Sequence, residues 1–127
     1  MDAVRNYLRQ KGYADFVVRD GIAGLIERWE DVVASVVAGQ EQFQDDYLND
    51  MDGRRILEEA LAIAPPAERA LWSARLAAAD RRIREHLVAT KECIWGEENA
   101  RKYGYIREQD WWYFHRPRVV EPTWRAF

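Results

Sequence analysis

Three side chains, His86, Thr90 and Cys93, have the types and the spacing of a metal site or of a nucleophile with its base. Steps of four and three residues would place them on one face of a helix. A zinc site usually needs four ligands, however, and the chain has one further histidine, His115, and no second cysteine. The carboxylate of Glu92 would also raise the pKa of the adjacent thiol rather than lower it. We therefore predict a buried packing cysteine, a half-buried histidine, and no metal or cofactor.

The segment from Asp50 to Gly53, followed by Glu59, has the acids and the glycine of a calcium-binding loop. In that register the first ligand position falls on Leu48, which has no side-chain oxygen. The position that requires an apolar residue holds Arg55 instead. We interpret these acids as helix caps and as part of a solvated helix face.

The remaining acids offer no catalytic pair. Neighbours such as Glu58 and Glu59 point about 100° apart on a helix, so they cannot face each other across a substrate. The chain also has no glycine-rich phosphate loop, no Gly-x-Ser-x-Gly motif and no His-Glu-x-x-His motif. No catalytic residue is predicted, and nothing in the sequence favours an enzyme.

Acidic residues are concentrated between residues 41 and 64. This segment holds seven acids against two arginines, a local charge of −5 in a chain whose net charge is −3. Acids interleaved with aromatic residues suit docking onto a basic protein, because opposite charge speeds encounter and buried aromatic rings hold the complex. The alternative is an ordinary solvated helix face. We predict a partner-binding surface formed by Phe43, Asp45, Asp46, Tyr47, Asp50 and Asp52.

The C-terminal arm, about residues 105–127, is aromatic and then basic. Residues 110–118 read DWWYFHRPR, and the prolines at 117 and 122 favour extended backbone. Such an arm could stack on bases, but it offers too few arginines to neutralise many phosphates, so tight nucleic-acid binding is not expected. We predict instead that the aromatic residues fold back over the open end of a long central helix and that the arginines pair with the acids of residues 41–59. The residues concerned are Trp111, Trp112, Arg116, Arg118 and Trp124.

The element expected to position these groups is one long helix over about residues 66–95. Pro65 and Pro66 suit the first turn of a helix and Gly96 suits its exit, with no other glycine or proline between them. About 30 residues at about 1.5 Å each give roughly 45 Å, more than the diameter of about 36 Å expected for the whole chain. Part of its apolar face should therefore be uncovered unless the arm packs on it. That face repeats at steps of three and four residues: Trp72, Leu76, Ala79, Ile83, Leu87, Thr90 and Ile94.

Shorter helices are predicted on both sides of the long one, from the same periodicity and from cap residues. The fold class is therefore all-α, a single-domain bundle of about five to six helices spanning residues 1–127 around the long helix, with the C-terminal arm packed across it. The predicted shorter helices are residues 2–11, a turn within 13–19, 20–39 capped by Asp20, a helical segment containing residues 43–51, one capped by Asp50 or Asp52 that ends at Pro65, and 97–103 stopped by Gly104.

The composition indicates where in the cell the protein is found and which class of partner it binds. The single cysteine, the absence of an apolar leader and the absence of a run of about 20 apolar residues predict a cytoplasmic protein without a membrane span. The sequence pI of about 5.5 argues against a surface built for nucleic acid.

Three functions compete on this basis. The first is a non-enzymatic protein-binding module. In general character, small, acidic, helical and cytosolic, the chain resembles the bacterial immunity proteins that neutralise nuclease toxins, which implies a basic protein partner. The second is a structural protein that self-associates as a homodimer through the 65–96 stripe. The third is a small enzyme or nucleic-acid binder that uses the arm. We expect the first.

Overall fold

The computed structural model describes residues 2–125 and confirms an all-α fold. Within that range the chain forms five α-helices, one 3₁₀ turn and one antiparallel pair of short strands. In chain order the elements are α1 (Ala3–Gln10), α2 (Asp15–Val37), α3 (Gln44–Ile63), α4 (Pro66–Arg84), β1 (Leu87–Ala89), α5 (Glu97–Tyr103), η1 (Trp111–Phe114) and β2 (His115–Pro117).

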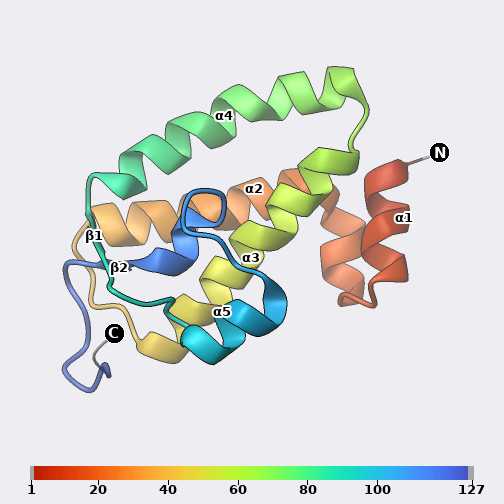
Figure 1. Ribbon diagram of the computed structural model, residues 1–127. Helices are drawn as coiled ribbons and strands as arrows, with labels where there is room; N and C mark the ends of the chain where they lie inside the picture. The colour runs from red at the N-terminus through yellow and green to blue at the C-terminus, as the bar shows by residue number, and fades with distance from the viewer. Residues whose placement is uncertain (1, 126–127) are drawn as a thin grey trace.

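The centre of the fold is α2, which packs against α1, α3 and α4. Figure 1 shows α4 running along one side of α2, α1 lying at one end, and α5 beside the N-terminal half of α3. Residues repeating at helical spacing on α2 are buried against these neighbours: Ile22, Leu25, Ile26, Trp29, Val33 and Val36. The central element is therefore α2 and not the helix that begins at Pro66.

A break at Gly21 divides α2 into a short first segment and a longer second one. Gly21 has φ 61° and ψ −152°, a backbone region that is essentially restricted to glycine. The Arg5 side chain of α1 lies against this position and donates a hydrogen bond to the Arg19 carbonyl oxygen. The first segment carries Phe16 and Val17 toward α3, which matters for the groove described below.

The predicted cap at Asp50 or Asp52 is wrong, because α3 continues through both residues. Its buried face includes Tyr47, Met51 and Leu57 on both sides of the expected break, so packing of one continuous apolar face outweighs the local capping signal. The first turn carries two acids, where the positive end of the helix dipole stabilises negative charge.

The predicted long helix over residues 66–95 is wrong in its last third, because α4 ends at Arg84. The amide of Thr90 donates to the Phe114 carbonyl oxygen at 2.9 Å, and that of Ile94 donates to the Tyr113 carbonyl oxygen at 2.8 Å. Beside them, β1 pairs with β2. The arm thus supplies the backbone partners that a helix would have supplied, and it does so where β-branched residues favour extended backbone.

The apolar periodicity still predicted burial correctly, since Leu87, Thr90 and Ile94 are all buried. Because α4 has 19 residues, its length is about 28 Å, within the expected diameter of the chain. The helix is therefore not longer than the folded chain, and it has no uncovered end of the kind that the predicted length implied.

The C-terminal arm folds back as predicted but enters the core instead of lying across a long helix. All four residues of η1 are buried, next to α3 and the β1 segment. Further on, Val120 forms a parallel bridge with Gln42. Across residues 2–125 no ion pair joins Arg116 or Arg118 to the acids of residues 41–59, so that part of the prediction is wrong; the last two residues of the arm, 126–127, lie outside the described range.

Several local predictions are confirmed. The first helix, α1, lies within the predicted residues 2–11, and α5 ends at Gly104 with φ 70°. Cys93 is fully buried and His86 is half-buried. None of the helices in the described part of the chain is long and apolar enough to cross a membrane.

Candidate functional site

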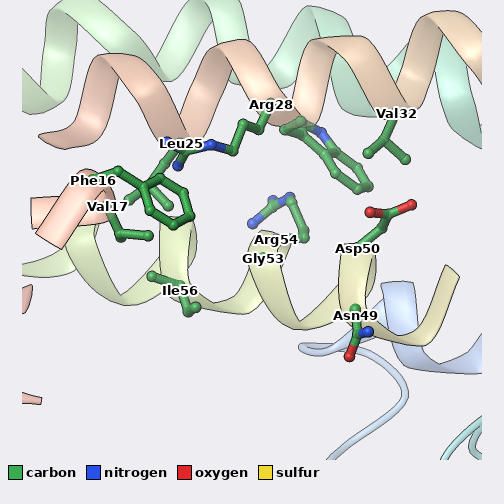
Figure 2. A pocket seen from close by; sticks show the side chains of 11 residues that line it. Phe16, Val17, Leu25, Arg28, Val32, Asn49, Asp50, Gly53, Arg54 and Ile56 are labelled. Carbon is green, nitrogen blue, oxygen red and sulfur yellow. The ribbon is translucent and has the colours of Figure 1, made fainter. Parts of the chain in front are cut away.

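A groove of about 190 Å³ lies between α2 and α3. Figure 2 shows Phe16 and Val17 at one end of it and Val32 and Asp50 at the other. Its walls are mostly apolar, and Gly53 leaves space on the α3 side, since a Cβ placed there would meet no atom within 4 Å. The lining residues are Phe16, Val17, Leu25, Arg28, Trp29, Val32, Asn49, Asp50, Gly53, Arg54 and Ile56.

Two arginines line the groove, and each has an acidic partner within the chain. Arg28 pairs with Asp20 at 2.9 Å and lies over the Phe16 ring, 4.8 Å from its centroid. Arg54 is only 3% exposed and makes two hydrogen bonds to the Asp80 carboxylate, at 3.1 and 2.7 Å. Both positive charges are therefore largely neutralised before any ligand approaches.

The Arg54 pair belongs to a buried network that joins α2, α3 and α4. The Trp29 indole N–H donates to the same Asp80 carboxylate at 2.9 Å. The guanidinium also lies over the rings of Trp29 and Trp112, at 5.8 and 4.5 Å from their centroids. Because a buried charge needs both a counter-charge and hydrogen bonds, this network is a rigid structural support for the groove wall.

Asp50 differs from the two arginines, because its carboxylate has no ion pair and no hydrogen bond to another side chain within residues 2–125. Burial raises its pKa to about 6, and the nearby negative charge of Asp46 adds to the rise. At neutral pH the groove therefore ends in an ionised carboxylate that lacks a counter-charge.

The predicted acidic surface is partly assembled by the fold. Phe43 is 55% exposed, and Asp45 and Asp46 are exposed beside it at the start of α3, one turn from Asp50. Phe43 and Asp45 also line a shallow depression with Glu121, Thr123 and Arg125 of the arm. Phe43, Asp45, Asp46 and Asp50 therefore lie together at the N-terminal end of α3.

Two of the predicted residues lie elsewhere. The Tyr47 side chain is fully buried, with its ring 5.7 Å from that of Trp124, so it supports the surface from below. Its burial raises the pKa of the phenol. Asp52 points to a different side of α3, where it accepts a hydrogen bond from the Tyr113 hydroxyl at 2.6 Å.

The predicted residues of the arm are mainly structural. Trp111 and Trp112 are 8% and 1% exposed, and the Trp124 indole donates to the Gln42 carbonyl oxygen at 2.6 Å. Arg116 donates to the carbonyl oxygen of Pro117. The tryptophan rings at 111 and 112 cannot stack on bases from within the core.

Sequence reasoning missed the groove itself. Phe16 and Val17 belong to a dense apolar run with no visible partner, and Arg54 looked like an isolated charge on an acidic segment. The available signal was Gly53, a glycine inside an otherwise helical pattern, which marks a place where side chains are absent from a packed face.

Neither metal nor thiol chemistry gains support from the described residues. Between residues 2 and 125 no three His, Cys, Asp or Glu side chains are grouped to hold a metal ion. Burial raises the pKa of Cys93, which disfavours the thiolate that a nucleophile requires. No protein-family model, curated protein or solved structure matches this chain.

Proposed function

We propose that the protein is a non-enzymatic binding module that docks a basic segment of a protein partner on the acidic end of α3. A lysine or arginine of that partner inserts its side chain into the groove between α2 and α3. The observation that carries the proposal is the unpaired Asp50 carboxylate at one end of an apolar groove.

Long basic side chains match both the apolar walls of this groove and the carboxylate at its rim. Their methylene stems bury apolar surface, worth about 0.8 kcal/mol per CH₂ group, against Phe16, Leu25 and Trp29. Their charged heads stay at the rim, as such side chains do at other apolar surfaces. There the head would meet Asp50 and, one turn away, Asp46. A neutral side chain would leave the half-buried carboxylate without a partner.

The surrounding surface favours the same class of partner. Asp45 and Asp46 are exposed and make no ion pair with any residue from 2 to 125, so they attract a positively charged segment from a distance and accelerate its encounter. Phe43, exposed next to them, offers an aromatic anchor of the kind that often dominates binding energy.

The two other functions lose the features on which they rested. Self-association through the 65–96 stripe required a free apolar face, whereas Leu76, Ala79 and Ile83 are buried within the chain. Nucleic-acid binding through the arm required exposed tryptophans, whereas those at 111 and 112 are buried.

The test uses capped arginine amide and capped lysine amide as probes, with capped norleucine amide as the neutral control of similar stem. We expect the basic probes to shift the backbone amide signals of Val32, Asp50 and Gly53 in heteronuclear NMR spectra. The effect should weaken as the pH falls through about 6, because Asp50 becomes protonated. Asp50→Asn should abolish the preference for the basic probes.

A matched charge control separates a local effect from a general one. Neutralising Asp45, Asp46 and Asp50 with asparagine should weaken binding and flatten its salt dependence. A second variant, with Glu85, Glu92 and Glu108 changed to glutamine, loses the same charge from exposed positions outside the groove. Equal weakening in both variants, or equal shifts from norleucine amide, would contradict the proposal.

A further inference from the structure

A second cavity, of about 240 Å³, opens between α3 and the segment that contains α5. It is lined by Asp52, Trp95, Asn99, Tyr103 and Tyr105. Three aromatic rings and one carboxylate thus surround a space smaller than the roughly 300–1,000 Å³ of pockets for drug-sized ligands. The occupant that fits is a small group rather than a large molecule.

The carboxylate in this cavity is held in position by two hydrogen bonds. The Oδ1 atom of Asp52 accepts from the Tyr113 hydroxyl at 2.6 Å and from the Trp95 indole N–H at 3.2 Å. Both bonds use the same oxygen, so Oδ2 keeps its capacity to face a ligand. Asp52 is two residues from Asp50, about 200° around the helix, so this cavity is separate from the α2–α3 groove and the inference does not rest on the proposed function.

The aromatic walls are held in place by the fold. Gly104 ends α5 in a left-handed conformation, with φ 70°, and lies between Tyr103 and Tyr105. These two rings stack with centroids 5.7 Å apart, and Tyr105 stacks in turn on the buried Tyr113 at 4.3 Å. On the other wall, the Asn99 amide donates to the Trp95 carbonyl oxygen at 2.9 Å. Little rearrangement is needed before a ligand binds.

The tyrosine rings already attract cations from the chain itself. The Arg55 guanidinium lies over the Tyr105 ring at 5.0 Å, and it is paired with Asp110 at 3.2 Å. The Lys102 ammonium lies over the Tyr103 ring at 5.3 Å. Arg55 is neutralised by its partner. Lys102 is exposed, makes no ion pair among residues 2–125, and can move into solvent when another cation arrives.

We propose that this cavity binds an alkylammonium ion, with its methyl groups against the Trp95 and Tyr103 rings and the Asp52 carboxylate balancing its charge. A methylated ammonium is weakly hydrated and spreads its charge over C–H groups, which suits aromatic faces. A calcium ion takes about six to eight oxygen ligands and usually several carboxylates, whereas this cavity is lined by a single carboxylate. The chemistry is shared by a free choline-type molecule and by a trimethylated lysine side chain.

Choline and capped trimethyllysine are the two probes, and 3,3-dimethylbutan-1-ol is the neutral molecule with the shape of choline. Calorimetry should show that at least one cationic probe binds about tenfold more tightly than the alcohol. That probe should also shift the Trp95 indole N–H signal, assigned with Trp95→Phe. If one cationic probe binds much more tightly than the other, it identifies the source; similar affinities mean that the ammonium group alone is recognised.

Variants separate the charge from the rings. Asp52→Asn keeps an oxygen for both hydrogen bonds but removes the charge, and should weaken choline binding about tenfold without changing binding of the alcohol. Tyr103 is 56% exposed, so its replacement should not unfold the protein. Tyr103→Ala should cost about fivefold, whereas Tyr103→Phe should stay within about twofold.

The result that overturns the proposal is equal affinity for the cationic probes and the neutral alcohol. Failure of both cationic probes to move the Trp95 signal, in a protein that circular dichroism shows to be folded, would overturn it as well. Loss of binding in Asp52→Asn counts only if that variant unfolds at a similar urea concentration to the parent.

Discussion

Changing Asp50 to asparagine should stabilise the protein at neutral pH, although it removes the residue on which the proposed function depends. The carboxylate is partly buried and has no positive partner, and its pKa lies at about 6 instead of the ordinary 3.8. Ionising it in the folded state is therefore unfavourable. Asparagine has similar size and helix propensity but cannot ionise.

The magnitude follows from the displacement of the pKa. Each unit corresponds to about 1.36 kcal/mol, so the rise from 3.8 to about 6 sets an upper limit of about 3 kcal/mol. Asp50 is only partly buried, and solvent screens the charge, which lowers the expected gain to about 1–2 kcal/mol.

The pH dependence fixes the sign of the effect. Between pH 3.8 and about 6 the folded state holds a proton on Asp50 that the unfolded state has lost. The stability of the parent protein therefore falls across this window as the pH rises, and stays lower above it. The advantage of Asp50→Asn should be complete above about pH 6, and it should vanish below 3.8.

Urea denaturation of parent and variant at about pH 4 and about pH 7.5 measures this difference. Asp31→Asn is the matched control, because Asp31 is an exposed acid within α2; it should change stability by less than about 0.5 kcal/mol at either pH. A gain of equal size at both pH values, or no gain at pH 7.5, would refute the assignment of an unpaired, ionised carboxylate at the groove. A stabilised variant that no longer binds a basic probe would show stability given up for function.

Further variants test the framework that supports both cavities. Gly21→Ala should destabilise the protein by about 1–3 kcal/mol, because a side chain strains the backbone conformation at this position. Gly53→Ala should stabilise the protein by about 0.5–1 kcal/mol, because Gly53 lies inside a helix with open space around it. Thermal unfolding of both variants measures the difference. Asp80→Asn should cost about 3 kcal/mol in urea denaturation, since it removes the carboxylate that accepts two hydrogen bonds from the buried Arg54 guanidinium and leaves it the more distant Glu58 at 3.6 Å. Tyr113→Phe should cost about 1–2 kcal/mol by the same assay, because it removes a 2.6 Å hydrogen bond to a carboxylate of α3.

Helix ends set by neighbouring residues were predictable along the chain. The side chain of Asp2 satisfies an amide three residues later, Pro66 begins a helix at no cost, and Gly104 ends one with a positive φ. Each of these effects acts within one turn of backbone, so the residues that cause it are adjacent in the sequence. The all-α class and the identity of most buried positions follow from periodicity in the same way.

The apolar periodicity did not predict the backbone conformation where a segment distant in the sequence forms the backbone hydrogen bonds instead of the helix. Residues 87–94 have apolar spacing suited to a helix, and the residues on that spacing, Leu87, Thr90 and Ile94, are indeed buried. The amides of Thr90 and Ile94 nevertheless donate to the carbonyl oxygens of Phe114 and Tyr113, which lie about twenty positions away along the chain. A spacing of three and four residues reports which side chains are buried, but it does not report which carbonyl oxygen each amide will find.

At the candidate sites, too, some features follow from the sequence alone and others depend on tertiary packing. An excess of acid over residues 41–64 is a property of composition, and it was visible before any folding. That Asp50 ends an apolar groove, that Tyr47 lies beneath the surface, and that Asp52 turns to an aromatic cavity depend on which elements pack against each side of α3. Charge is carried by a residue wherever it goes, whereas burial, pKa and pairing are created by neighbours that only the tertiary fold brings together.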